Sequence, residues 1–157
     1  MLTVRNVSNN PFYNQAFEEY VYETFRDDDV FLLWKNTPAV VVGSYQNICR
    51  EVHVEALRKR GIPVVRRISG GGTIYTDMGG WQFTFIQHKE AGEIEFSQYI
   101  APVIDALREM GVNAAFNGCN DLTIDGKKFS GNAQYRLGDC IVHHGSLLFD
   151  TDIRQMV

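Results

Sequence analysis

The chain has 157 residues, 45% of them hydrophobic and 22% charged, and its formal net charge is −4. This length and composition predict one folded domain, residues 1–157, and exclude a disordered chain. The acidic balance argues against a broad nucleic-acid-binding surface, and no apolar stretch or leader-like N-terminus directs the chain to a membrane. Three scattered cysteines fit reduced thiols, so a cytoplasmic location is expected.

The first part of the chain predicts one helix followed by strands. Residues 10–26 have helical spacing, with Asn10 as N-cap and Pro11 at the first helical position. Their apolar residues cluster near one helical face, namely Phe12, Ala16, Tyr20 and Phe25. Residues 30–35 and 38–45 are apolar and β-branched, and the Asn-Thr-Pro turn between them predicts a β-hairpin.

The middle of the chain alternates between helices and strands. A short helix is predicted within residues 51–60, ended by Gly61, and the β-branched segment that follows predicts a strand at 62–68. The alternating pattern at 81–87 predicts a half-buried strand, followed by a loop at 89–93.

A second long helix is predicted at 97–110, with Ser97 as cap and Gly111 as stop. The remaining residues are strand-like, and Asp125 and Gly126 mark a tight hairpin turn. This mixed order predicts an α+β fold with a mainly antiparallel or mixed sheet.

The segment RRISGGGTIYTDMGG, residues 66–80, places three glycines directly after a predicted strand. Because glycine loses much backbone freedom on folding, such a run indicates close backbone approach, and its N–H groups are suited to an anion. Arg66 and Arg67 add donors for phosphate or carboxylate. A purely structural turn explains the pattern equally well, and neither a P-loop nor a dinucleotide motif is present.

Two further clusters carry polar groups on predicted strands. Lys127 and Lys128 follow the hairpin turn and face opposite sides, so at most one points into a site, and solvated lysines are the alternative. His143 and His144 also face opposite sides; packed strand histidines are the alternative, because no zinc motif accompanies them. Ser146 has no nucleophile-elbow motif around it.

Three more side chains have two interpretations each. Trp34 and Trp81 are expected in the core, although either is suited to the wall of an apolar pocket. Cys119 is expected to be an inert buried thiol, and a nucleophile is the alternative.

Taken together, the ordered motifs resemble the catalytic domain of lipoate-protein ligases, within the wider biotin/lipoate ligase and octanoyltransferase group. The motifs cover nearly the whole chain: NPFYNQAFEE, VVVGSYQNICREV, RRISGGGTIYTD, NDLTIDGKKFSGNAQ and HHGSLLFD. The resemblance implies an α+β fold with a central mixed, largely antiparallel sheet and a second small sheet, flanked by helices.

The resemblance also implies a two-step reaction, in which Mg²⁺-ATP activates lipoate to lipoyl-adenylate and the lipoyl group then passes to a lysine. The implied acceptors are lipoyl domains of 2-oxoacid dehydrogenase complexes or the glycine-cleavage H protein. Lys128 matches the catalytic lysine, Lys127 does not, and Asp121 matches a position near the metal. The implied binding residues are Arg67, Ser69, Gly70, Gly71, Gly72, Thr73, Ile74, Tyr75, Asp77, Asn120, Asp121, Lys128 and His144, with Trp34 and Gly43 lining the pocket.

The chain departs from the family pattern at several positions. Thr76 stands where the family often has histidine, residues 79–82 replace a GNxN motif, and Cys119 replaces an arginine. Family members continue past HHGSLLFD with more of the catalytic domain and then a small accessory domain, so the resemblance implies a catalytic domain that is incomplete at its C-terminal end. A fragment, a subunit with a separate C-terminal accessory domain and a truncated copy all stay open. Two alternatives to the ligase function stay open: a cysteine-dependent octanoyl or lipoyl transferase between carrier proteins, and a truncated, non-catalytic lipoate-binding protein.

Overall fold

The computed structural model of the chain describes residues 1–88 and 95–155, so the predicted loop at 89–93 lies outside the described residues. The helices are α1 (Pro11–Thr24), α2 (Ile48–Glu51), α3 (Val54–Arg60), α4 (Ser97–Glu109) and the short 3-10 helix η1 (Ile153–Gln155). The strands are β1 (Leu2–Arg5), β2 (Val30–Trp34), β3 (Ala39–Val42), β4 (Val64–Arg66), β5 (Ile74–Thr76), β6 (Gly80–His88), β7 (Ala114–Phe116), β8 (Asp121–Ile124), β9 (Lys127–Leu137) and β10 (Cys140–Leu148).

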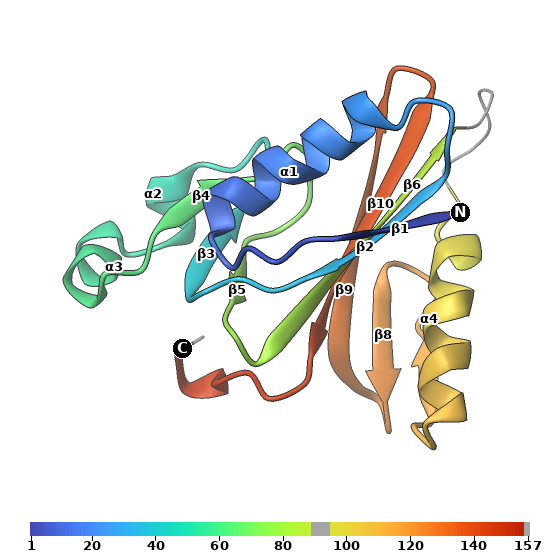
Figure 1. Cartoon of the computed structure of the whole chain (residues 1–157). Helices are drawn as coiled ribbons and strands as arrows, with labels where there is room; N and C mark the ends of the chain where they lie inside the picture. The colour runs from blue at the N-terminus through green and yellow to red at the C-terminus, as the bar shows by residue number, and fades with distance from the viewer. Residues whose placement is uncertain (89–94, 156–157) are drawn as a thin grey trace.

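The strands form two sheets, as Figure 1 shows. The large sheet has seven strands in the order β1-β2-β6-β10-β9-β8-β7, and the small sheet has three in the order β4-β3-β5. Only the pairs β1–β2 and β3–β4 are parallel among the described strands. The α+β prediction with a mixed, largely antiparallel sheet is therefore confirmed.

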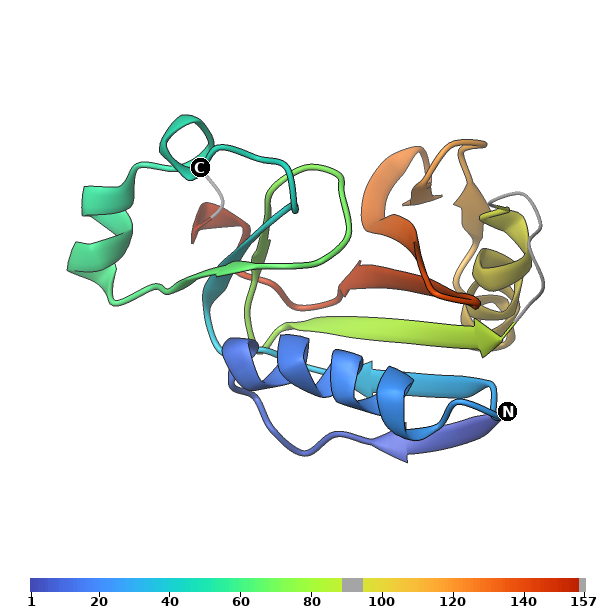
Figure 2. The same ribbon diagram turned by 90° about the horizontal axis from the view of Figure 1, so that it is seen from above.

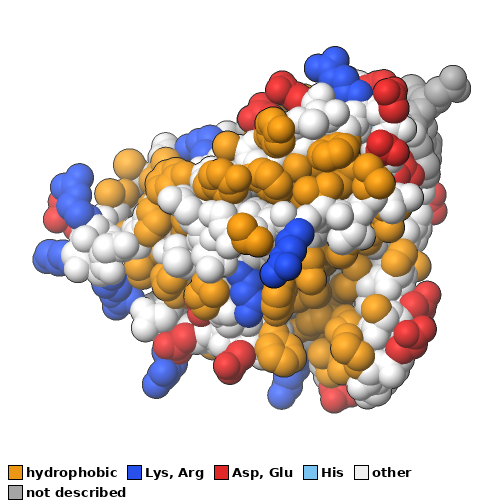
Figure 3. Space-filling model, viewed as in Figure 1, with side chains coloured by type: hydrophobic (Ala, Val, Ile, Leu, Met, Phe, Trp, Pro, Cys, Tyr) orange, Lys and Arg blue, Asp and Glu red, His pale blue; other side chains and the backbone are white. Residues whose placement is uncertain are grey.

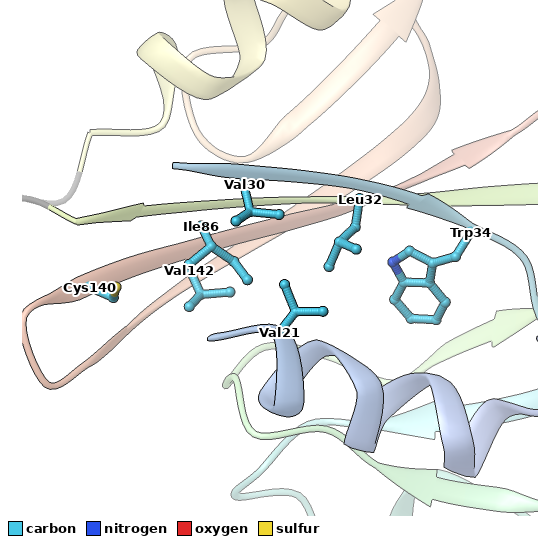
Figure 4. Packing of buried hydrophobic residues seen from close by; sticks show 7 residues of the cluster. All are labelled: Val21, Val30, Leu32, Trp34, Ile86, Cys140 and Val142. Atoms are coloured by element: carbon cyan, nitrogen blue, oxygen red, sulfur yellow. The ribbon is translucent and has the colours of Figure 1, made fainter. Parts of the chain in front are cut away.

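Helices α1 and α4 cover opposite faces of the large sheet. Because successive strand residues point to opposite sides, alternate residues of β6 and β10 pack beneath different helices. Between α1 and the sheet lies a cluster that Figure 4 shows, made of Val21 of α1 and the strand residues Val30, Leu32, Trp34, Ile86, Cys140 and Val142. On the other face, the α4 residues Tyr99, Ile100 and Ile104 pack on strand residues and on the residues of β7 and β8 beside them, namely Phe83, Phe85, Ile141, Ala114 and Leu122. No helix within the described ranges is long and apolar enough to cross a membrane.

Helix α1 begins as predicted but buries a different face. The Asn10 side chain accepts a hydrogen bond from the backbone N–H of Phe12 at 2.9 Å, which confirms the cap. Phe12 and Tyr20 are 55% and 58% exposed, and Figure 3 shows hydrophobic side chains on the outer surface over this region. The buried positions include the polar residues Asn14 and Glu18. Of the predicted apolar face only Phe25 packs against the core, because the sheet beneath α1 offers polar partners to Asn14 and Glu18 as well as apolar surface.

The hairpin predicted for residues 30–45 is wrong. Strand β2 lies between β1 and β6 in the large sheet, whereas β3 lies between β4 and β5 in the small sheet. The turn residue Asn36 is fully buried; it accepts a hydrogen bond from Asn14 Nδ2 at 2.8 Å and donates one to Thr76 Oγ1 at 3.3 Å. This connection therefore carries the chain from one sheet to the other.

The glycine stops of two helices are confirmed, since Gly61 and Gly111 have φ of 65° and 83°. The helix predicted within 51–60 covers less of that range, because α2 and α3 are separate. The predicted Ser97 cap is wrong: the N-cap position is Phe96, which makes no side-chain capping bond.

The later strands follow the prediction. The hairpin turn at Asp125 and Gly126 has φ of 50° and 75°, as a type I′ turn requires. Trp34 lies in the core as expected. Trp81 is only half-buried, and Lys35 Nζ lies 4.3 Å from its ring centroid, so its assignment to the core is wrong.

Candidate active site

A cavity of about 190 Å³ lies where the segment between β4 and β5 faces the β8–β9 hairpin and the end of β10. Figure 2 shows these segments facing one another, the first in green and the hairpin in orange. A wider groove of about 770 Å³ adjoins it and also borders α2 and α3. The cavity and the groove meet at their shared lining residues, Thr73, Ile74, Lys128, Gly131 and Ser146.

Arg67 organises the glycine-rich segment. Its guanidinium donates hydrogen bonds to the carbonyl oxygens of Gly70 and Gly72 at 2.8 and 2.7 Å, and to that of Val41 at 3.2 Å. Its Nε donates to Ser69 Oγ at 3.0 Å. Because one planar fork ties three carbonyls and a hydroxyl together, Arg67 fixes the shape of the cavity wall.

Arg66 performs a similar task on the neighbouring segment. Its Nη1 donates to the backbone carbonyls of Gly43 at 2.8 Å and Gln46 at 2.9 Å. Gln46 in turn accepts a hydrogen bond from Thr73 Oγ1 at 2.6 Å, which links this segment to the cavity lining. Both arginines therefore bind backbone carbonyls, a role that the sequence pattern did not predict.

Two glycines explain the close packing of this region. Gly71 has φ of 92°, a conformation that L-residues with a side chain rarely adopt. A Cβ on Gly43 would collide with the carbonyl oxygen of Gly71, so Gly43 lies beneath the segment and does not line the cavity. The segment therefore needs glycine at Gly71 for its left-handed backbone, and Gly43 allows the backbone of the two segments to approach closely.

The predicted site residues of this segment separate into two groups. The cavity or the groove is lined by Arg67, Gly71, Gly72, Thr73, Ile74 and Tyr75. Ser69 is fully buried behind the wall, and Gly70 lines neither hollow. The Asp77 carboxylate accepts hydrogen bonds from the backbone N–H groups of Gly79 and Asp152, both at 2.9 Å, so it holds the turn before β6 and the segment after β10.

Lys128 is the cationic side chain at the junction. It lines both the cavity and the groove, whereas Lys127 lines neither, as their opposite directions along β9 predict. Lys128 Nζ lies 2.8 Å from Asp121 Oδ1. With 57% of the Lys128 side chain exposed, this ion pair adds only about 0–1 kcal/mol of stability, so it serves mainly to orient the ammonium group.

Asp121 also bears on the metal prediction. It belongs to no group of three metal-ligating side chains; within the described ranges the one such group is His88, Asp139 and Cys140, at the other end of β6 and β10. Mg²⁺ is commonly held by one or two carboxylates together with substrate phosphates and water. Asp121 lines neither the cavity nor the groove, but its carboxylate contacts Lys128, which lines both, and a single carboxylate there fits Mg²⁺ that arrives with a nucleotide.

The cavity floor contains a buried polar network that includes one residue the sequence pattern missed. His144 Nδ1 lies 3.2 Å from Glu18 Oε1, and His144 Nε2 lies 2.6 Å from Ser69 Oγ. His144 and Asn120 line the cavity, and the side-chain amides of Asn120 and Asn132 each donate a hydrogen bond to the backbone carbonyl of the other residue. Glu18 was not predicted, because the sequence pattern placed the buried face of α1 on its apolar side.

The three cysteines are free, and none of them lines the cavity or the groove. Cys119 is exposed, so the expectation of a buried thiol there is wrong. Burial and the nearby charge of Asp139 raise the pKa of Cys140 to about 11. The structure therefore places no activated thiol at Lys128, which gives the cysteine-dependent alternative no support.

A family model described as the lipoyl protein ligase A/B catalytic domain matches residues 10–157. Lipoate-protein ligase LplJ of Bacillus subtilis is 39% identical over 160 residues, which cover 100% of this chain and 48% of that protein. Lipoate-protein ligase 1 of Staphylococcus aureus is 36% identical, with coverage of 96% and 48%. The chain thus spans about half the length of the curated relatives that it matches.

Solved structures agree with this. P. falciparum LipL1 in complex with lipoate has a TM-score of 0.91 at 25% identity, covering 99% of this chain and 50% of that one. The bi-partite lipoate protein ligase of Thermoplasma acidophilum, described with its E2 lipoyl domain, has a TM-score of 0.89 at 26% identity, with coverage of 98% and 62%. Since the family model matches almost the whole sequence, this chain belongs to the lipoyl protein ligase A/B catalytic domain family.

Proposed function

We propose that this chain is the catalytic domain of an ATP-dependent lipoate-protein ligase. A lipoate carboxylate oxygen attacks the α-phosphorus of Mg²⁺-ATP, the bond from that phosphorus to the bridging oxygen breaks, and pyrophosphate leaves. A lysine amine of the acceptor then attacks the acyl carbon, AMP leaves, and an amide bond forms with loss of a proton. The relatives named lipoate-protein ligase and the lipoate-bound structural neighbour support this proposal.

The observation that carries the proposal is the position of Lys128 where the cavity and the groove meet. Attack of a carboxylate on a phosphate brings two anions together, and a fixed ammonium group at the junction lowers that barrier. We propose that the lipoyl chain occupies the cavity and that ATP occupies the groove. The two substrates then meet at Lys128.

The cavity walls suit an apolar chain with one charged end. Trp34, Val41 and Ala133 provide apolar surface, while Asn120 and Lys128 lie toward the hairpin side. We propose that the glycine-rich wall binds the acyl and phosphate portions through its backbone, with Arg67 holding its shape. Asp121 is proposed to help hold Mg²⁺, which would supply charge neutralisation at the phosphates.

The test compares two adjacent lysines. Lys128→Ala is expected to reduce pyrophosphate release from ATP and lipoate by on the order of 10²-fold or more, because it removes the charge at the reacting groups. Lys127→Ala is the matched control and is expected to stay within about threefold of the wild type, since a solvated side chain rarely contributes. Equal behaviour of the two variants would contradict the assignment.

The assay is made with the chain alone and with any accessory region that its full-length protein has. Pyrophosphate release in neither case, with lipoate still bound in calorimetry, would favour a non-catalytic lipoate-binding protein. For the second step, we propose lipoyl domains or the glycine-cleavage H protein as acceptors, in line with the lipoyl domain described with the Thermoplasma acidophilum ligase. A lipoyl mass increase on one acceptor lysine is the expected result.

A further inference from the structure

Glu18 is a buried carboxylate of α1, only 4% exposed, whose contacts come from three strands. Its Oε1 accepts a hydrogen bond from Thr84 Oγ1 of β6 at 2.6 Å, and its Oε2 accepts one from Tyr135 OH of β9 at 3.5 Å. His144 Nδ1 of β10 lies 3.2 and 3.3 Å from the two oxygens. Isolated carboxylates are costly to bury, so this arrangement requires a reason.

The electrostatics show that Glu18 is held as an anion. Burial alone raises the pKa of Glu18, but the electrostatic attraction of the His144 ring and the hydrogen bonds from His144, Thr84 and Tyr135 outweigh burial and keep the pKa below its ordinary value. Burial and the charge of Glu18 raise the pKa of Tyr135, so that partner stays a neutral donor. Glu18 therefore acts as an acceptor toward the His144 ring.

This contact sets the direction of the imidazole. An anionic acceptor beside Nδ1 keeps a proton on Nδ1, which leaves Nε2 facing Ser69 Oγ at 2.6 Å. Ser69 is fully buried and also accepts a hydrogen bond from Arg67 Nε at 3.0 Å. Since Arg67 holds the carbonyls of Gly70 and Gly72, a continuous chain of contacts runs from Glu18 to the cavity wall.

We propose that Glu18 is a positioning residue, which fixes the His144 tautomer and through Ser69 and Arg67 the shape of the glycine-rich wall. Glu18 lines neither the cavity nor the groove, so it acts through these residues and not on substrate. A fixed wall holds the acyl chain at the angle needed for attack, whereas a loosened wall still binds but orients poorly. This catalytic consequence rests on the proposed ligase reaction; the proton position does not.

The first test needs no activity. Imidazole ¹H–¹⁵N correlation spectra of the ¹⁵N-labelled wild-type chain at pH 7 report which ring nitrogen carries a proton. We expect a proton on His144 Nδ1. An unprotonated Nδ1 in the folded wild-type chain would overturn the inference, whatever the enzyme does.

The second test changes the acceptor. Glu18→Leu has similar bulk but no acceptor, so the neutral ring is expected to carry its proton on Nε2, and kcat should fall on the order of 10- to 100-fold with a much smaller change in KM. Glu18→Gln keeps an acceptor oxygen and should recover part of the Nδ1 protonation and part of the lost kcat. Glu19→Leu, at the exposed neighbouring position, is the matched control and should match the wild type in both measurements.

The third variant, Ser69→Ala, cuts the link without touching Glu18, and it also serves if Glu18→Leu does not fold. It should lower kcat as Glu18→Leu does while His144 keeps its Nδ1 proton. Wild-type kcat in a folded Ser69→Ala or Glu18→Leu variant would overturn the positioning role. If the wild type releases no pyrophosphate at all, the ligase proposal fails, and the imidazole spectra still decide the tautomer.

Discussion

His143 and His144 are neighbours on β10, yet they occupy opposite environments. The His143 ring is fully buried beneath α4 and stacks on Tyr99, with centroids 4.9 Å apart and planes 13° apart. Burial, and then the charge of His144, lower the pKa of His143 to about 3. His144 lies beneath α1 between a carboxylate and a hydroxyl. One residue type thus serves as a neutral packing ring and as a member of a charged network.

The difference shows that the covering helix decides the chemistry of each sheet face. Helix α4 brings the Tyr99 ring and aliphatic side chains, which provide no acceptor that would stabilise a charged imidazole. Helix α1 brings Glu18, whose anionic carboxylate the His144 ring satisfies. A functional histidine in this fold is therefore recognised by what lies across from it.

The largest expected effect comes from making the two histidines alike. His144→Phe removes the ring that lies 3.2 Å from the buried Glu18 carboxylate and leaves that charge without its partner, so we expect it to lower the unfolding free energy by about 3–5 kcal/mol. His143→Phe keeps a flat ring within the aromatic layer but removes the 3.3 Å contact between Nε2 and Asn132 Oδ1, so it should lower the unfolding free energy by only about 1–3 kcal/mol. Urea denaturation at pH 7 measures both. Equal losses would show that the two faces do not differ in this way.

A smaller effect follows from the neutral state of His143. Its pKa is lower in the folded chain than the ordinary 6.5, so the unfolded chain binds more protons as the pH falls through that range. Stability is therefore full above pH 6.5 and is lost progressively toward pH 3. From pH 6.5 to pH 5 this site should cost about 1.5 to 2 kcal/mol of unfolding free energy.

The comparison of wild type with His143→Phe isolates this contribution, because other titrating groups are shared. The unfolding free energy of the wild type should fall relative to that of His143→Phe as the pH falls from 6.5 to 5. Parallel curves over that range would contradict a neutral, buried His143.

The smallest expected effect concerns a single donor on the polar face. Thr84→Val keeps the shape but removes the hydroxyl that donates to Glu18, so a loss of about 1 kcal/mol is expected. Thr123→Val is the matched control, because its hydroxyl makes only an exposed 3.5 Å contact on the β7–β8 edge; it should stay within about 0.5 kcal/mol. Thermal melting of both variants measures the difference.

Local chemistry explains what was predictable in the fold. Gly61, Gly111 and the Asp125–Gly126 turn require positive φ, which sequence alone indicates. The prediction of a hairpin at 30–45 was wrong, because the sheet that a strand joins depends on partners far along the chain, such as β6 for β2 and β5 for β3. Strand identity is a local property, but strand pairing is not.

The candidate site divides in the same way. Lys128 was identified from its motif and from the alternation of strand directions, and the structure places it at the junction of the two hollows. The carbonyl contacts of Arg67 were not predictable, because a guanidinium suits carbonyls and anions equally. Glu18 could not be found because the apolar pattern of α1 favoured the opposite face.

Trp34 has a practical consequence. Its indole lines the cavity and its Nε1 lies 3.4 Å from Thr84 Oγ1, whereas Trp81 lies outside the cavity lining beside Lys35. With Trp81 replaced by phenylalanine, Trp34 becomes the sole tryptophan among the 157 residues. The cavity then contains its own fluorophore, and the wavelength and intensity of its emission report ligand binding in the cavity without any added label.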